Sequence, residues 1–135
     1  MIRVLVIDDS AVMRSFLARI VGAQDDMVLA GVVSDPLNAI SRIRQSAPDV
    51  ITLDVEMPGM NGLDFLGKLM AMRPIPVVMI SSVTQHGAEA TMRALELGAV
   101  DFFPKPAALE DMDAAAADIA DKIDKAAGKS RPSAA

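Results

Sequence analysis

Five short apolar runs recur along this chain of 135 residues, and a stretch whose apolar residues have helical spacing follows each run. Short apolar runs are typical of strands that are buried on both faces, and such strands occur in parallel sheets covered by helices. The sequence therefore predicts an α/β fold in which five strands alternate with five helices. The predicted strands are residues 2–7, 27–33, 50–53, 77–80 and 100–103, and the predicted helices are residues 11–21, 36–46, 62–73, 86–97 and 109–127.

Helical spacing also predicts which side chains pack against the sheet. Val12 belongs to the apolar stripe of the first helix, and Leu37 belongs to that of the second. In the fourth helix, at least two of Met92, Leu95 and Leu97 are expected to be buried. Hydrophobic residues make up 52% of the chain, so it has enough apolar material to form the core of one domain.

The expected topology gathers polar residues at one edge of the sheet. Right-handed crossovers and the common strand order 2-1-3-4-5 give a doubly wound five-stranded parallel sheet, whose topological switch point lies between the first and third strands. Asp8 and Asp9 follow the first strand, and Asp54 follows the third. The three carboxylates are therefore predicted to meet at the carboxyl edge, where such sheets bind their ligands. Ser81 and Lys105 follow the fourth and fifth strands and are expected at the same edge.

Each acidic residue also has a simpler interpretation when it is taken alone. Asp54 is then an ordinary surface acid, and Asp9 or Ser10 only caps the helix that follows it. Two acidic sites in the same relation to two neighbouring strands favour a binding site instead. Neighbouring carboxylates repel each other, and a bound cation removes that repulsion. Because the ligands are hard oxygens and few in number, the cation expected here is Mg²⁺.

The remaining groups point to phosphate chemistry. The ammonium group of Lys105 suits a phosphoryl oxygen, and the hydroxyl of Ser81 is a hydrogen-bond donor. A carboxylate, a metal ion, a lysine and a hydroxyl are the groups that an aspartyl-phosphate intermediate needs. The sequence therefore makes Asp54 the candidate nucleophile.

The motifs together resemble a known family. The pieces are Asp8-Asp9, Asp54-x-x-Met57-Pro58-x-Met60-Asn61-Gly62, Ser81 and Lys105-Pro106. This set is similar to the receiver domain of two-component response regulators, which has the flavodoxin/CheY-like fold. The resemblance covers about residues 1–127, and residues 128–135 are expected to be a flexible tail or an interdomain linker. Segments 53–58, 62–66, 76–82 and 93–99 resemble more closely the N-terminal regulatory domain of the CheB chemotaxis methylesterases.

The resemblance implies a role for each site residue. Asp54 would accept a phosphoryl group from a histidine kinase, and Lys105 would pair with that group. The Mg²⁺ ligands would be Asp8, Asp9, Asp54 and the backbone carbonyl of Glu56. Ser81 would be the switch hydroxyl, with Ser82 as the alternative, and Phe102 would be the coupled aromatic residue. Gly62 and Pro106 would be structural, and the Lys105–Pro106 bond is expected to be cis.

Composition excludes several other classes of function. The chain has no cysteine, so a disulfide framework and a zinc–thiolate cluster are impossible. The net charge of −5 and the aromatic content of 3% disfavour nucleic-acid binding. No apolar run approaches the ~18 residues of a membrane span, so no membrane partner is expected. The expected localisation is cytoplasmic.

Three functions remain open at this stage. The favoured one is a phosphorylation switch fed by a CheA-like histidine kinase, with a methylesterase domain or another protein as its output. This chain has no G-x-S-x-G and only one histidine, so it is expected to be the regulatory half of a longer protein or a stand-alone CheY-like receiver, and not itself an enzyme. The alternatives are a metal-dependent phosphatase with an aspartate nucleophile and an inert binding module with this fold.

Overall fold

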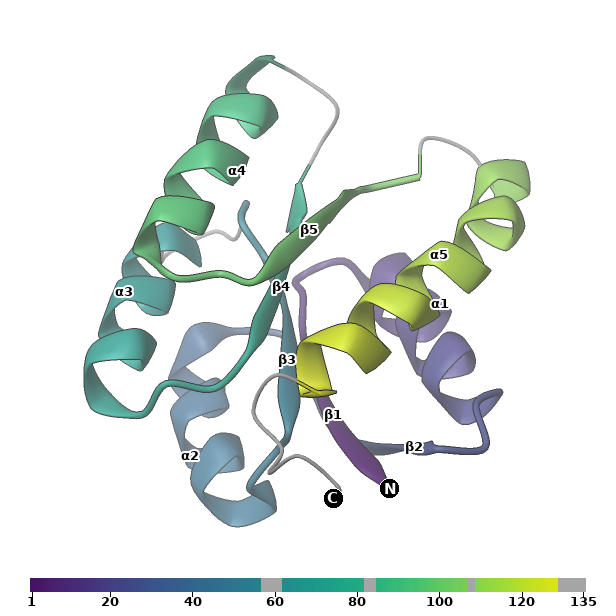
Figure 1. Ribbon diagram of the computed structural model, residues 1–135, viewed down its shortest axis with the longest axis horizontal. Coiled ribbons are helices and arrows are strands. Elements are labelled where there is room, and N and C mark those ends of the chain that lie inside the picture. Colours follow the sequence, from purple (N-terminus) through teal and green to yellow (C-terminus); the bar gives the residue numbers. More distant parts are fainter. Residues whose placement is uncertain (57–61, 82–84, 107–108, 129–135) are drawn as a thin grey trace.

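The sheet has the predicted topology. The computed structural model describes residues 1–56, 62–81, 85–106 and 109–128. Its five strands are all parallel and lie in the order β2-β1-β3-β4-β5 (Figure 1). The strands are β1 (Ile2–Ile7), β2 (Met27–Val33), β3 (Val50–Asp54), β4 (Val77–Ser81) and β5 (Asp101–Pro104).

Five helices cover the two faces of this sheet. They are α1 (Ala11–Gly22), α2 (Pro36–Ser46), α3 (Gly62–Met72), α4 (Gln85–Leu97) and α5 (Leu109–Gly128). Helices α1 and α5 cover one face, and α2, α3 and α4 cover the other (Figure 1). Each face has its own apolar cluster, because alternate residues of every strand point to opposite sides. Both clusters lie below the carboxyl edge and hold the strand ends in fixed positions.

The helix starts follow from capping chemistry. Ser10 is the N-cap of α1, where its hydroxyl accepts a hydrogen bond from the N–H of Met13 at 3.3 Å. Asp35 caps α2 in the same way, with the N–H of Asn38 as the donor at 3.0 Å. Since Ser10 is the cap of α1, the carboxylate of Asp9 is available for other contacts.

Some of the expected core residues are in fact exposed. Val12 is 57% exposed and Leu37 is 83% exposed, so both predictions of burial were wrong. The buried positions are Met13, one residue after Val12, and Ala39, two residues after Leu37. A helix turns by about 100° per residue, so a shift of one or two residues in the centre of the apolar stripe exchanges buried and exposed positions at its border.

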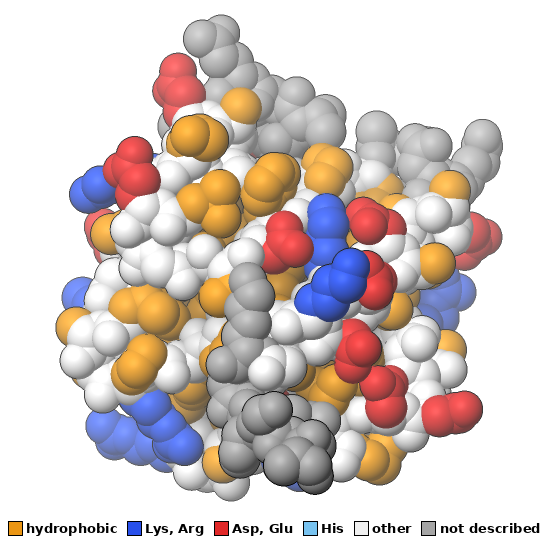
Figure 2. Space-filling view, in the orientation of Figure 1, with side chains coloured by type: hydrophobic (Ala, Val, Ile, Leu, Met, Phe, Trp, Pro, Cys, Tyr) orange, Lys and Arg blue, Asp and Glu red, His pale blue; other side chains and the backbone are white. Residues whose placement is uncertain are grey.

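The fourth helix departs from expectation in a similar way. Met92 is 63% exposed and Leu95 is 36% exposed, whereas Leu97 packs partly against the core. The small residues Ala90 and Ala94 occupy the buried face instead. Figure 2 shows apolar side chains on the surface over α4 and β5.

The C-terminal end of α2 contains a strained residue. Ala47 has a φ of 46° in the left-handed region, which favours glycine because a Cβ is poorly tolerated there. We expect Ala47→Gly to raise the free energy of unfolding by about 1 kcal/mol, measured by urea denaturation. Ala117→Gly on the exposed side of α5 is the control and should lower it by about 1 kcal/mol, since that position is right-handed. Equal signs for the two changes would contradict this account.

In the part of the chain that the structure describes, every helix is too short or too polar to cross a lipid bilayer.

Candidate functional site

Three carboxylates meet at the carboxyl edge of the sheet, as the sequence predicts. Strands β1 and β3 are neighbours in register, with Ile7 opposite Leu53, so the residues that follow them lie side by side. One carboxylate oxygen from each of Asp8, Asp9 and Asp54 lies within 4.8 Å of the others. Asp8 and Asp54 are fully buried, whereas Asp9 is exposed. The cluster therefore reaches solvent through Asp9.

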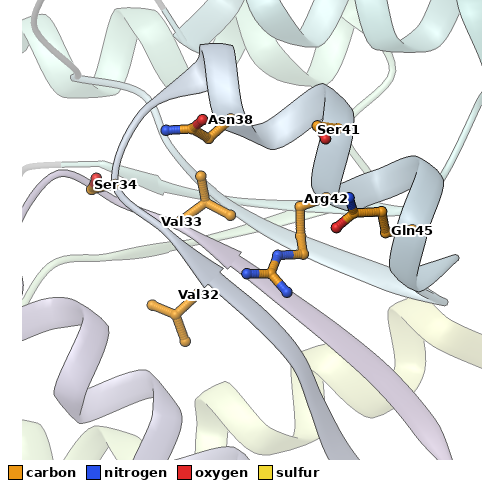
Figure 3. A pocket seen from close by; sticks show the side chains of 7 residues that line it. All are labelled: Val32, Val33, Ser34, Asn38, Ser41, Arg42 and Gln45. Carbon is orange, nitrogen blue, oxygen red and sulfur yellow. The ribbon is translucent and has the colours of Figure 1, made fainter.

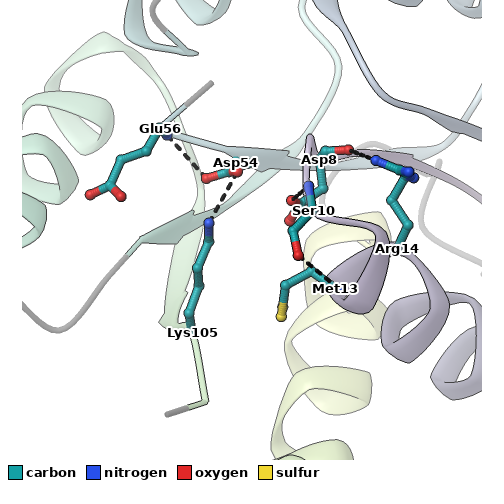
Figure 4. Close-up of polar contacts among 7 residues, drawn as sticks. All are labelled: Asp8, Ser10, Met13, Arg14, Asp54, Glu56 and Lys105. Atoms are coloured by element: carbon teal, nitrogen blue, oxygen red, sulfur yellow. Dashed lines mark hydrogen bonds and ion pairs between the residues drawn. The ribbon is translucent and has the colours of Figure 1, made fainter. Parts of the chain in front are cut away.

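Lys105 approaches this cluster from the end of β5 (Figure 4). Its Nζ lies 3.1 Å from Oδ2 of Asp54 and forms an ion pair with it. The backbone fixes the position of the lysine, because the N–H of Lys105 donates to the carbonyl of Ser81 at 2.8 Å. Sheet pairing therefore fixes the backbone of Lys105, and the ion pair with Asp54 holds its ammonium group at the cluster.

Backbone donors orient the two buried carboxylates. Oδ1 of Asp54 accepts a hydrogen bond from the N–H of Glu56 at 3.0 Å, and Oδ1 of Asp8 accepts one from the N–H of Ser10 at 2.9 Å. Arg14 also donates to the backbone carbonyl of Asp8 at 2.9 Å. Oδ2 of Asp8 is buried, and it has no hydrogen-bond partner among the residues that the structure describes.

The electrostatics of the site disfavour the charged form of its buried acids. Burial raises the pKa of Asp54 to about 7; a hydrogen bond that the protonated Asp54 donates to Asp9 and the charge of Asp8 act in the same direction. The N–H of Glu56 and the charge of Lys105 oppose this shift without cancelling it. The pKa of Asp8 is also raised, chiefly by burial.

Lys105 responds in the opposite sense to the same surroundings. Burial lowers the pKa of its ammonium group, but the charge of Asp54 and the hydrogen bond to it outweigh burial. The pKa of Lys105 is therefore raised, and the group stays charged. Among the described residues, the ammonium group of Lys105 is paired with a cluster of three carboxylates, so negative groups outnumber it.

The residues fit a small divalent cation. Carboxylate oxygens are the ligands that Mg²⁺ prefers, and three of them converge here. The partnerless Oδ2 of Asp8 is an acceptor that a cation would satisfy, because a buried acceptor is costly when it is left unpaired. A divalent ion would also offset the excess of negative charge.

The other predicted site residues lie near the edge with different surroundings. Ser81 is buried at the end of β4, and its hydroxyl bonds to Thr91 of α4 at 2.7 Å. Phe102 is 39% exposed on β5, where Nζ of Lys122 lies 5.6 Å from the centroid of its ring. The side chain of Glu56 is exposed, and the role predicted for its carbonyl stays a prediction. Ser82 and residues 57–61 lie outside the described residues.

The expectation for the peptide bond before Pro106 was wrong. The described residues contain no cis peptide bond, so Lys105–Pro106 is trans. The trans form is the intrinsic preference of such bonds. Here it follows a strand whose pairing continues as far as the N–H of Lys105.

Gly62 lies against the strand that carries Asp54. Its N–H donates to the carbonyl of Val55 at 3.2 Å. A Cβ built on this glycine would lie 2.5 Å from the carbonyl oxygen of Asp54. The start of α3 therefore packs directly on the backbone at the end of β3, and only a residue without a side chain fits.

Thr91 was missed by sequence reasoning. Its spacing from Gly87, Ala90 and Ala94 places it on the buried side of α4, and this spacing was the available signal. A polar residue on a buried face needs a partner, and the end of β4 supplies it in Ser81.

A separate polar pocket of about 320 Å³ lies between the edge strand β2 and α2 (Figure 3). Its lining residues are Val32, Val33, Ser34, Asn38, Ser41, Arg42 and Gln45. None of the three clustered carboxylates lines it, so this pocket is distinct from the acidic site.

Comparison with known proteins agrees with this fold and site. The family model for the response regulator receiver domain matches residues 4–117. The chain belongs to this family and is therefore a receiver module of two-component signalling. It resembles the crystal structure of the response regulator domain of Thermotoga maritima CheB, with 42% sequence identity and a TM-score of 0.86. That alignment covers 98% of this chain and 99% of the other.

Curated relatives are longer proteins. The chain is 60% identical over 128 residues to a protein-glutamate methylesterase/protein-glutamine glutaminase of Ralstonia nicotianae, which covers 93% of this chain and 34% of the relative. It is 55% identical over 132 residues to the protein of the same name in Methylobacillus flagellatus, covering 96% of this chain and 37% of the relative. The chain thus spans about a third of the length of these relatives.

Proposed function

We propose that Asp54 accepts a phosphoryl group from a histidine kinase in a Mg²⁺-dependent reaction, and that this modification switches an output. The observation that supports the proposal most directly is the position of Asp54, buried between two further aspartates and 3.1 Å from the Lys105 ammonium group. A lone structural acid gains nothing from such surroundings, because its charged form is disfavoured there.

The transfer step follows from these groups. A carboxylate oxygen of Asp54 attacks phosphorus, a P–O bond forms, and the bond from phosphorus to the donor's imidazole nitrogen breaks. The electron pair of that bond returns to the imidazole. Lys105 stabilises the charge on the phosphoryl oxygens, and the N–H of Glu56 holds the carboxylate in position. Mg²⁺, when bound, supplies the additional positive charge that the transfer needs.

The ligands proposed for that ion are Asp8, Asp9, Asp54 and the backbone carbonyl of Glu56. The convergence of the three carboxylates supports this set, and so does the partnerless oxygen of Asp8. Ser81, with Ser82 as the alternative, and Phe102 are the proposed switch residues that respond to the phosphoryl group.

The proposed output is a methylesterase domain joined through the tail. The similarity to two methylesterases along a third of their length supports this assignment. The receiver would then comprise residues 1–127, with 128–135 as the linker. A CheA-like kinase is the proposed phosphodonor. In this proposal the chain itself accepts the phosphoryl group and does not act as an esterase.

The proposal is tested by incubating the protein with acetyl phosphate and Mg²⁺. Intact mass spectrometry should show the mass of one phosphoryl group added, and borohydride reduction followed by peptide mapping should locate it on Asp54. A chelator should prevent the modification, whereas Asp64→Asn on the exposed side of α3 should leave it unchanged. No addition, or addition at another residue, contradicts the proposal.

A further inference from the structure

The hydroxyl of Ser81 is engaged on the side of the sheet away from Asp54. Ser81 shares the face of β4 with Val77 and Met79, which pack against α3 and α4. On β3, Ile51 and Leu53 point to the face covered by α3 and α4. Side chains alternate along a strand, so Asp54 points to the opposite face. A rotation about χ1 of Ser81 is therefore needed before its hydroxyl can face the phosphoacceptor.

The hydrogen bonds around Thr91 have a definite direction. Oγ1 of Thr91 lies 2.7 Å from Oγ of Ser81 and 2.9 Å from the carbonyl oxygen of Gly87. A carbonyl only accepts, so the single hydroxyl hydrogen of Thr91 goes to Gly87. Ser81 must then be the donor to Thr91, and its only hydrogen is unavailable to any other acceptor.

Both hydroxyls are shielded from water. Ser81 is 4% exposed and Thr91 is 6% exposed, so water does not readily replace either partner. When Ser81 leaves, Thr91 keeps its own bond to Gly87 and no donor is left unpaired. Leaving Thr91 therefore costs the Ser81 hydroxyl about one ordinary hydrogen bond, which a phosphoryl oxygen on Asp54 would replace.

We infer that Thr91 is a positioning residue that holds the Ser81 hydroxyl away from Asp54 until a phosphoryl group competes for it. This inference rests on the proposed function of Asp54. In this arrangement Thr91 opposes phosphorylation slightly. Because Thr91 belongs to α4, release of Ser81 also removes a contact between α4 and β4.

The test compares the affinity of the full chain for beryllium fluoride, a mimic of a phosphoryl group on a carboxylate, by calorimetric titration in excess Mg²⁺. Thr91→Val keeps the volume and removes the acceptor, so it should bind about fivefold more tightly than the wild type. Thr91→Ser restores the hydroxyl and should restore the wild-type affinity. Thr91→Ala removes the same acceptor without adding a methyl group, and should also tighten binding.

A second pair of variants separates positioning from packing. In a Ser81→Ala background there is no hydroxyl to release, so adding Thr91→Val should change nothing. Two results would overturn the inference while leaving the proposed function intact. In the first, Thr91→Val still raises the affinity for beryllium fluoride in the Ser81→Ala background. In the second, the wild type binds beryllium fluoride but the Thr91 variants bind it no more tightly. A wild type that fails to bind beryllium fluoride with Mg²⁺ overturns the proposed function, and the inference with it.

Discussion

Replacing Asp54 by Asn should abolish phosphoryl labelling and at the same time make the metal-free protein more stable. Labelling is lost because an amide is not a nucleophile. Stability rises because the buried site disfavours a charge at this position, and the amide resembles the neutral acid. At pH 8 without metal, the free energy of unfolding should increase by about 2 to 4 kcal/mol, because the pKa of Asp54 stays raised even with the opposing charge of Lys105 included.

The stability difference between Asp54→Asn and the wild type should depend on pH. The pKa of Asp54 is raised to about 7 in the folded protein from an ordinary value of 3.8, so the folded state binds more protons between these limits. Stability from this group is therefore complete below about pH 4 and is lost as the pH rises to about 7. The difference between the variant and the wild type should be largest above pH 7 and should vanish near pH 4.

Urea denaturation of both proteins at several pH values in a chelating buffer measures this difference. Excess Mg²⁺ should reduce or reverse it, because an ion that binds the folded wild type more tightly stabilises it more. Asp64→Asn is the control, because it makes the same chemical change at an exposed position and leaves the buried site intact. A metal-free wild type at least as stable as Asp54→Asn at pH 8 would contradict the account of the site.

The sequence predicted those site residues that directly follow a strand, because the strand fixes their position. In a parallel sheet, residues that follow neighbouring strands must converge, so Asp8, Asp54 and Lys105 were found without coordinates. The strand order was predicted from the commonest order of such sheets, and the structure confirms it.

What the sequence left undetermined depends on packing between elements. The border of an apolar helix stripe is set by the neighbouring surface, so the predictions for Val12 and Leu37 were wrong. Thr91 acquires its meaning only when α4 lies against the end of β4. The isomer of the Lys105–Pro106 bond was inferred from resemblance alone, and the structure contradicts it.

Gly62→Ala should destabilise the protein strongly, although the substitution adds a single methyl group in a helix. The new Cβ would lie 2.5 Å from the carbonyl oxygen of Asp54 and 2.9 Å from Cα of Val55, and both atoms belong to the backbone. Neither can move without shifting the end of β3. We expect the free energy of unfolding to fall by about 3 kcal/mol, measured by urea denaturation.

Gly67→Ala in the same helix is the matched control. Apart from its chain neighbours and the adjacent helix backbone, no atom lies within 4 Å of its Cβ position, so the substitution only removes the conformational freedom of glycine and should raise the free energy of unfolding by about 0.8 kcal/mol. Both positions belong to α3, so comparing the two variants separates the clash of the new Cβ with the backbone of β3 from the effect of alanine on helix propensity. Since the strain falls on the backbone of Asp54, Gly62→Ala should also slow labelling by acetyl phosphate, whereas Gly67→Ala should not. Similar effects at the two glycines would mean that the start of α3 does not position Asp54.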